Sequence, residues 1–211
     1  MNNQFTDVTS IAEGLVLNSF DRLSFGNAEL QNGLSHNLSL FYRSFNLFNN
    51  TNVFARLSYN KNIDQIRSIA NFDNVITTST FFNSQFADES LSASGSWNKR
   101  FGKIRTGMRA NFNYSLRNQF IGGRQSVNES FIQSYTPEFR TNFREAPNVR
   151  LRYNYSISNN TQGTRTTKIV TNAPSIRFDA YIWDSLTFVT DYRYNNQEIE
   201  GESESFTTWS A

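Results

Sequence analysis

The segment K-I-R-T-G-M-R-A-N-F-N-Y-S-L-R, residues 103–117, alternates between apolar and polar side chains. Its apolar residues occupy even positions, and its odd positions carry asparagine, serine and several arginines. A period of two is the period of a β-strand, whose successive side chains point to opposite faces. A strand with one apolar face and one wet, basic face is typical of a membrane-spanning β-barrel, which meets lipid outside and water inside.

The same alternation returns along most of the chain, in residues 38–43, 53–60, 91–98, 135–143, 149–158, 176–180 and 186–195. With the segment at 103–117 and an alternating C-terminus, this pattern predicts about nine long strands. We therefore expect an all-β fold in which an antiparallel meander forms part of a large transmembrane β-barrel.

Composition argues against several other classes of protein. The chain is 37% hydrophobic, and no run approaches the roughly 20 apolar residues that a transmembrane helix needs. Its mean hydropathy of −0.56 does not argue against membrane strands, because alternation cancels in any average. The lack of cysteine excludes disulfide scaffolds and cysteine metal sites. A net charge of +2, with arginines spread over many segments, predicts no nucleic-acid partner.

Turn-forming residues divide the chain into hairpins. Tight turns are predicted at residues 49–51, 100–103, 146–148 and 183–185. Longer polar connections are predicted at residues 70–74, 122–126, 159–164 and 197–202. Because no signal peptide follows Met1 and the last residues still alternate, we interpret the chain as an internal fragment of a longer polypeptide.

The first part of the chain carries a resemblance to a known family. The segment L-S-F-G-N-A-E-L, which begins at Leu23, resembles the Gly-Asn-Pro-x-Leu stretch before a mid-barrel strand of TonB-dependent receptors, with Ala28 in place of the proline. Residues 45–59 and 97–108 resemble the barrel of the subfamily with long, Asn-rich strands. From this resemblance we expect residues 1–35 to be a loop and strand segment leading into the barrel, and residues 36–211 to be strands of an incomplete barrel.

The resemblance implies a location and a role. Such receptors lie in the outer membrane of Gram-negative bacteria as 22-strand barrels closed by an N-terminal plug domain. They import bulky ligands, such as siderophores, cobalamin or glycans, with force supplied by TonB. The partners implied are therefore outer-membrane lipid and, through parts that have no counterpart in this chain, the plug and TonB. The chain itself would be part of the barrel wall.

Charged residues on the polar positions of the strands are the candidates for the face that lines the lumen. They are Arg105, Arg109, Arg117, Arg140, Arg150, Arg152, Arg177, Asp179, Asp191 and Arg193. They could contact an anionic ligand or the plug, or they could pair across strands and stiffen the wall, and we favour the pairing role. On the lipid face each arginine would cost about 2–4 kcal/mol at the membrane midplane.

Residues that could carry chemistry are few, and we predict that the chain is not an enzyme and binds no metal or cofactor. His36 is the single histidine and is interpreted as an ordinary hydrogen-bonding residue. The glutamates at 198, 200, 202 and 204 could form a cation or ligand site, although a solvated loop is favoured. Gly122, Gly123 and Arg124 lack the pattern of a phosphate-binding loop and are expected at a loop tip.

Aromatic residues beside the predicted tight turns, Trp97, Phe101, Tyr181 and Trp183, fit a girdle at the membrane interface, with cross-strand packing as the alternative. Two other functions remain open. The chain could be a soluble or surface-attached β-rich binding module of the adhesin type, or a small complete porin-like barrel. The expected strand length argues against a sandwich, whose strands have about 5–6 residues.

Overall fold

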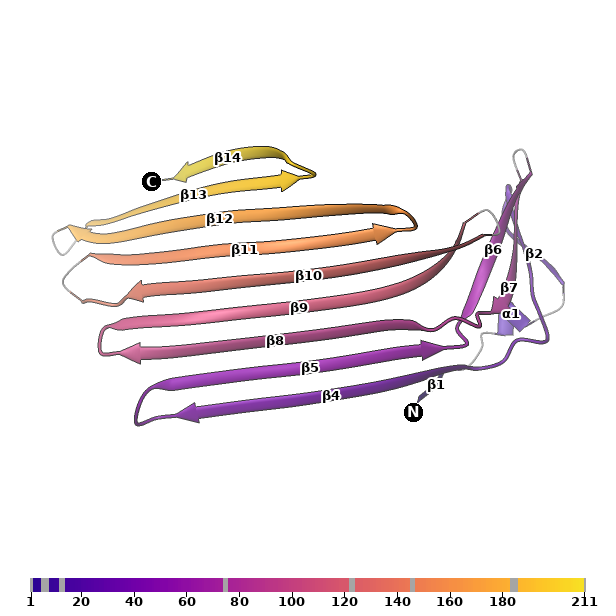
Figure 1. Ribbon diagram of the computed structural model, residues 1–211, viewed down its shortest axis with the longest axis horizontal. Coiled ribbons are helices and arrows are strands. Elements are labelled where there is room, and N and C mark those ends of the chain that lie inside the picture. The colour runs from indigo at the N-terminus through magenta and orange to yellow at the C-terminus, as the bar shows by residue number, and fades with distance from the viewer. Residues whose placement is uncertain are drawn as a thin grey trace.

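The structure, a computed structural model, is built from strands and one helical turn (Figure 1). It describes all residues except 1, 5–7, 12–13, 74–75, 122–123, 145–146, 183–185 and 211. The elements are β1 (Asn2–Gln4), α1 (Val8–Ile11), β2 (Leu15–Ser19), β3 (Arg22–Phe25), β4 (Gly33–Asn46), β5 (Thr51–Ile63), β6 (Ile66–Asp73), β7 (Ile76–Asn83), β8 (Asp88–Phe101), β9 (Ile104–Ile121), β10 (Arg124–Thr141), β11 (Asn148–Gln162), β12 (Arg165–Ile182), β13 (Leu186–Ile199) and β14 (Glu202–Ser210).

A single large sheet, here called the main sheet, has the strand order β1-β4-β5-β8-β9-β10-β11-β12-β13-β14. Every neighbouring pair in it is antiparallel. Apart from the short β1, these are nine long strands in chain order, so the predicted all-β antiparallel meander is confirmed. In Figure 1 they lie side by side as one wall.

A small second sheet, with the order β2-β3-β7-β6, lies beyond one end of the main sheet (Figure 1). The parallel pairing of β3 with β7 links its two halves. One half is the N-terminal segment, and the other is a hairpin, β6–β7, inserted between β5 and β8. The prediction of a loop at residues 70–74 was therefore wrong for residues 70–73, which end β6. Sequence reasoning missed this hairpin because its apolar residues do not alternate cleanly.

The small sheet is attached to the main sheet through Arg67 of β6. Its Nη2 atom lies 2.6 Å from Asp88 Oδ2 on β8, and its Nη1 atom donates a hydrogen bond to the carbonyl of Asn118 on β9. Beside this contact the ring of Phe120 packs edge-on against Phe82, with 5.0 Å between centroids. A mixed polar and aromatic junction thus fixes the hairpin at the ends of β8 and β9.

Short turns join β4 to β5, β8 to β9, β11 to β12 and β13 to β14. The turns predicted at residues 49–51 and 100–103 are found at residues 47–50 and 102–103, with φ values of 50° at Asn50 and 56° at Gly102. Thr51 already begins β5, and Phe101 still belongs to β8. The longer connections predicted at 159–164 and 197–202 were wrong, since β11 and β12 join at Gly163–Thr164, and β13 and β14 join at Glu200–Gly201. Polar residues continue these strands because they still pair across the ladder, as Thr161 Oγ1 and Thr166 Oγ1 do at 3.0 Å.

The remaining predicted turns lie partly or wholly on residues that the structure does not describe. Residues 183–185 and 122–123 are of this kind, while residues 124–126 already belong to β10. Of the turn at 146–148, Asn148 begins β11. The strands of the main sheet have two ends. We call the end that carries the β8–β9 turn the Gly102 end, and the end that carries the β11–β12 turn the Gly163 end.

No hydrophobic core is formed by the described residues. Among them a single hydrophobic residue is buried, Ala180 at 9% exposure, whereas large apolar side chains such as Leu40 and Trp209 are 56% and 72% exposed. A globular protein of this length would bury a substantial apolar interior. The main sheet is a single layer with both faces open. Within the described part of the chain, no helix is long and apolar enough to cross a membrane.

Candidate functional site: the two faces of the main sheet

The strand register separates the main sheet into two faces of different chemistry. On β9 the odd-numbered residues 105–117 define what we call the polar face, and the even-numbered residues 104–116 define the apolar face. Direct pairing extends each face across the sheet, since Phe112 lies opposite Ala93 of β8 and Gln133 of β10, and Asn111 lies opposite Ser94 and Ser134. The alternation predicted along each strand therefore aligns between strands.

All the charged residues predicted for the lumen share the polar face. They are Arg105, Arg109 and Arg117 on β9, Arg140 on β10, Arg150 and Arg152 on β11, Arg177 and Asp179 on β12, and Asp191 and Arg193 on β13. The register thus brings together residues that are up to 88 positions apart, from Arg105 to Arg193. Whether this face lines a lumen stays a prediction.

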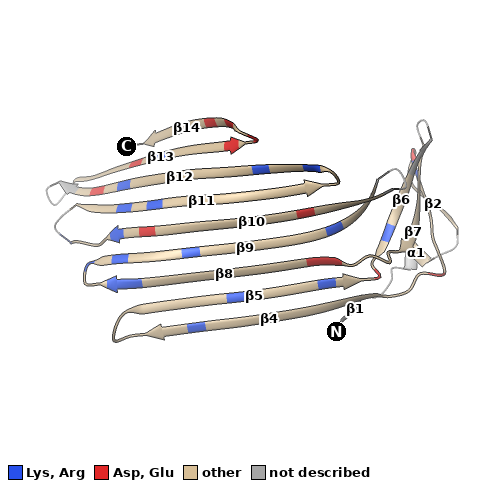
Figure 2. Ribbon diagram, viewed as in Figure 1, with Lys and Arg blue, Asp and Glu red and all other residues tan. Residues whose placement is uncertain are grey.

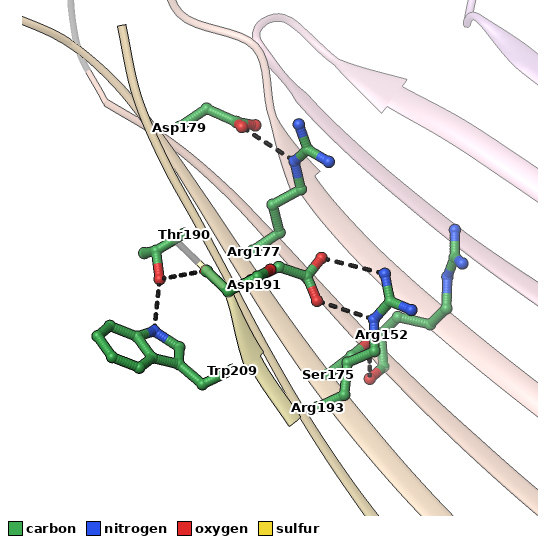
Figure 3. Close-up of polar contacts among 9 residues, drawn as sticks. Arg152, Ser175, Arg177, Asp179, Thr190, Asp191, Arg193 and Trp209 are labelled. Carbon is green, nitrogen blue, oxygen red and sulfur yellow. Dashed lines mark hydrogen bonds and ion pairs between the residues drawn. The ribbon is translucent and has the colours of Figure 1, made fainter. Parts of the chain in front are cut away.

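Three ion pairs neutralise part of this face. Arg152 Nη2 lies 2.8 Å from Glu138 Oε2 on the neighbouring strand. Arg177 Nε lies 2.9 Å from Asp179 Oδ1, and Arg193 Nε lies 2.8 Å from Asp191 Oδ1 (Figure 3). The predicted pairing across strands is therefore found for Arg152. Arg177 and Arg193 pair instead with carboxylates two residues away on their own strands.

Sequence reasoning missed a row of arginines that runs across the strands near the Gly102 end. Arg100 of β8 lies opposite Arg105, Arg105 opposite Arg140, Arg140 opposite Arg150, and Arg150 opposite Arg177. We call these residues the arginine row. Figure 2 shows basic residues gathered at this end of β8 to β12. Alternation within one strand cannot reveal the row, because it gives no register between strands.

Two hollows on the polar face are lined by arginines of this row. The first, of about 440 Å³, lies by the β4–β5 turn and is lined by Asn50, Asn52, Asn98, Arg100 and Arg105, with Phe45 and Lys99 at its side. The second, of about 570 Å³, includes Arg150 and Arg177. The hollows therefore lie at opposite ends of the row.

Charged residues mark the limit of the apolar face toward the Gly163 end. Lys61 Nζ of β5 lies 2.6 Å from Glu89 Oε1, and the next charged residues on this face are Glu129, Lys168 and Glu198. By register, Glu129 is level with Glu89. Lys168 lies two residues nearer the Gly102 end, and Glu198 lies two residues nearer still. The boundary of the apolar face thus runs diagonally across the strands.

Aromatic residues occupy the apolar face near the Gly102 end. Trp97 and Phe101 are there as the girdle prediction requires, while Trp183 and the side chain of Tyr181 lie outside the described residues. Trp209 was not among the aromatic residues predicted for the girdle. It lies opposite Tyr192 on this face, and its Nε1 donates a hydrogen bond to Thr190 Oγ1 at 2.8 Å (Figure 3). Its alternation with Thr208 and Ser210 was the available signal.

The predicted glutamate cluster is brought together only in part. Glu198 lies on the apolar face, whereas Glu200, Glu202 and Glu204 line one hollow of about 340 Å³. Glu200 is at the turn, where its Oε1 is 3.9 Å from Arg165 Nη2. His36 pairs with Lys61 on the apolar face. Among the described residues no group of three or more histidine or acidic side chains could hold a metal ion.

Comparison of the chain with protein-family models, with curated proteins and with solved structures found no match.

Proposed function

We propose that the chain is part of the wall of a transmembrane β-barrel in the outer membrane of a Gram-negative bacterium. One observation carries the proposal: the apolar face of the main sheet is open and is bounded by charged residues. Large apolar side chains on it, including Leu91, Leu151 and Ile176, are 39–44% exposed. In water such a face would lead to aggregation, whereas lipid chains cover it in a barrel wall.

The height of the apolar face fits a bilayer. On β10 it runs from Phe131 to Phe139 between Glu129 and Thr141. At about 3.4 Å per residue this is about 27 Å along the strand, and a tilt of about 40° reduces it to about 21 Å across the membrane. The apolar band of outer-membrane barrels is about 25 Å tall. The diagonal boundary from Glu129 to Glu198 supports such a tilt, because the edge of a membrane crosses tilted strands obliquely.

The barrel that we propose is that of a TonB-dependent receptor of the 22-strand type, which imports a siderophore, a cobalamin or a glycan. The support is the resemblance around Leu23 and in residues 45–59 and 97–108. The two edges of the main sheet also support a larger barrel. On the side away from β5, β4 pairs only with the short β1 among the described strands, and β14 pairs only with β13. A sheet in a membrane has to pair such edges.

A soluble β-rich binding module is the second candidate, and the open polar face is compatible with it. The apolar face disfavours it, because no described element covers that face and no second layer is present. A small complete barrel is disfavoured by the two separate edges.

The experiment that tests the proposal is purification with and without detergent, followed by sedimentation analysis. We expect the chain to sediment as large aggregates without detergent and as a monodisperse, β-rich species in detergent micelles. A soluble, monodisperse monomer that melts cooperatively without detergent would contradict the membrane assignment. The receptor assignment is tested separately by the coding sequence upstream, which should encode a plug domain; a stop codon directly before this chain would contradict it.

A further inference from the structure

We propose that the arginine row is a binding site for a multiply charged oxyanion, a molecule with several phosphate or carboxylate groups. The proposal goes beyond the barrel-wall function and does not depend on it, since it requires only that the polar face meets water. It concerns Arg100, Arg105, Arg140 and Arg150, together with the hollow beside the first two.

The first argument is electrostatic. Residues directly opposite each other in an antiparallel pair have Cα atoms about 4.5–5.5 Å apart, and like charges at such positions are destabilising. The row repeats this unfavourable arrangement at four successive strand pairs, from Arg100 to Arg177. Elsewhere on the same face, Arg152 lies opposite the carboxylate of Glu138. Arg177 is compensated by Asp179, and the other four arginines of the row form a local concentration of uncompensated positive charge.

The second argument is that the nearby carboxylates are already engaged. Glu138 binds Arg152, Asp179 binds Arg177, and Asp191 binds Arg193. Within the described part of the chain, the four guanidinium groups of Arg100, Arg105, Arg140 and Arg150 form no ion pair. The Nε atom of Arg150 is also buried without a hydrogen-bond partner among these residues. Hydrogen-bond donors thus remain along the row.

The third argument is the shape and chemistry of the hollow at the β8 end. Arg100 and Arg105 line it together with Asn50, Asn52 and Asn98, whose side-chain amides can donate hydrogen bonds. Arg100 Nε donates to the carbonyl of Gly102 at 3.0 Å, which fixes the side chain and leaves its two terminal nitrogens for a ligand. Guanidinium groups bind oxyanions through two parallel hydrogen bonds, which suits phosphate and carboxylate.

Because strands are spaced about 4.8 Å apart, four adjacent arginines extend over about 14 Å. A single small anion can reach two of them, and a chain of oxyanion groups can reach more. The row therefore predicts that affinity rises with the number of charged groups, from inorganic phosphate to tripolyphosphate.

The test is isothermal titration of the chain, folded in detergent micelles at low salt, with inorganic phosphate, tripolyphosphate and citrate. We expect saturable binding of tripolyphosphate, citrate or both, each tighter than phosphate; the tighter of the two shows whether phosphate or carboxylate groups are preferred. The double variant Arg105→Gln/Arg140→Gln should weaken binding about tenfold or more. The matched control Arg165→Gln, an exposed arginine at the Gly163 end, should change it less than about twofold. Absence of binding, or an equal loss in both variants, would overturn the proposal.

A stability measurement keeps the test informative if the double variant folds differently. In buffer without polyanion, Arg140→Gln should raise the urea midpoint of unfolding, because it removes the repulsion between Arg140 and its two neighbours Arg105 and Arg150. With tripolyphosphate present the wild-type chain should have the higher urea midpoint, because it gains more stability from binding the polyanion than the variant does. Equal midpoint changes in both buffers would contradict an anion site at the row.

Discussion

At the scale of single residues, the face on which a position lies decides how much free energy a charged side chain costs there. Ala93 and Ser92 are neighbours on β8, yet Ala93 lies between Leu57 and Phe112 and Ser92 lies between Ser58 and Asn113. If the apolar face meets lipid, a charge is excluded from the first position and accepted at the second. If both faces met water, the two positions would tolerate a charge equally.

We therefore predict that Ala93→Arg lowers the free energy of unfolding in lipid vesicles by about 2–4 kcal/mol, the cost of a guanidinium near the midplane. The matched variant Ser92→Arg should stay within about 0.5 kcal/mol of the wild type. Urea titration followed by tryptophan fluorescence measures both. Equal effects of the two substitutions would count against a lipid-facing band.

The polar face was predictable from alternation within each strand, and its arginines were selected correctly as members of one face. The arginine row was not predictable. Its existence depends on the register that places Arg140 opposite both Arg105 and Arg150, and no local pattern specifies that alignment.

At the scale of elements, strands whose apolar and polar residues alternate regularly were predicted from the sequence. Strands without this alternation were missed. The alternation of residues 149–158 predicts most of β11. In β6 and β7, by contrast, Ile66, Ile69, Phe81 and Phe82 follow no period of two, because these strands pair in a small sheet at the end of the wall. Turn lengths were misjudged where polar residues continue a ladder, as before Gly163.

The hairpin β6–β7 should depend on Arg67, which binds Asp88 and the Asn118 carbonyl at a junction where both charged side chains are 17% exposed. We predict that Arg67→Met costs about 2 kcal/mol locally, because it leaves a mostly buried carboxylate without its partner. Hydrogen exchange should quicken in β6 and β7 while β10 to β12 keep their protection. Loss of protection throughout the main sheet would contradict this prediction, because it would show that the hairpin and the main sheet unfold together.

The β8–β9 turn should depend on the conformational freedom of Gly102, whose φ is 56°. We predict that Gly102→Ala lowers the free energy of unfolding by about 1 kcal/mol, because alanine is disfavoured in that region. Gly95, on the straight part of β8, is the control: an added Cβ would lie 3.8 Å from its nearest contact, the Phe54 carbonyl. Gly95→Ala should therefore raise stability by about 0.5 kcal/mol, and a loss at Gly95 as large as that at Gly102 would argue against the turn as the cause.

At the scale of the whole molecule, the main sheet is one layer, and the described residues form no hydrophobic interior. If the proposed membrane location is correct, lipid covers the apolar face and replaces the hydrophobic core that the described residues lack. The polar face would then line water, with paired charges that stiffen it and an arginine row that is open to anions.

The lipid-facing assignment is tested most directly by a spin-label scan of β9. The chain has no cysteine, so a single cysteine can be introduced at each of residues 104–117 and labelled with a nitroxide. In lipid vesicles, we predict that oxygen accessibility peaks at the even positions and that accessibility to a water-soluble nickel complex peaks at the odd positions, with a period of two. Equal accessibility of both sets of positions to the nickel complex would contradict the account.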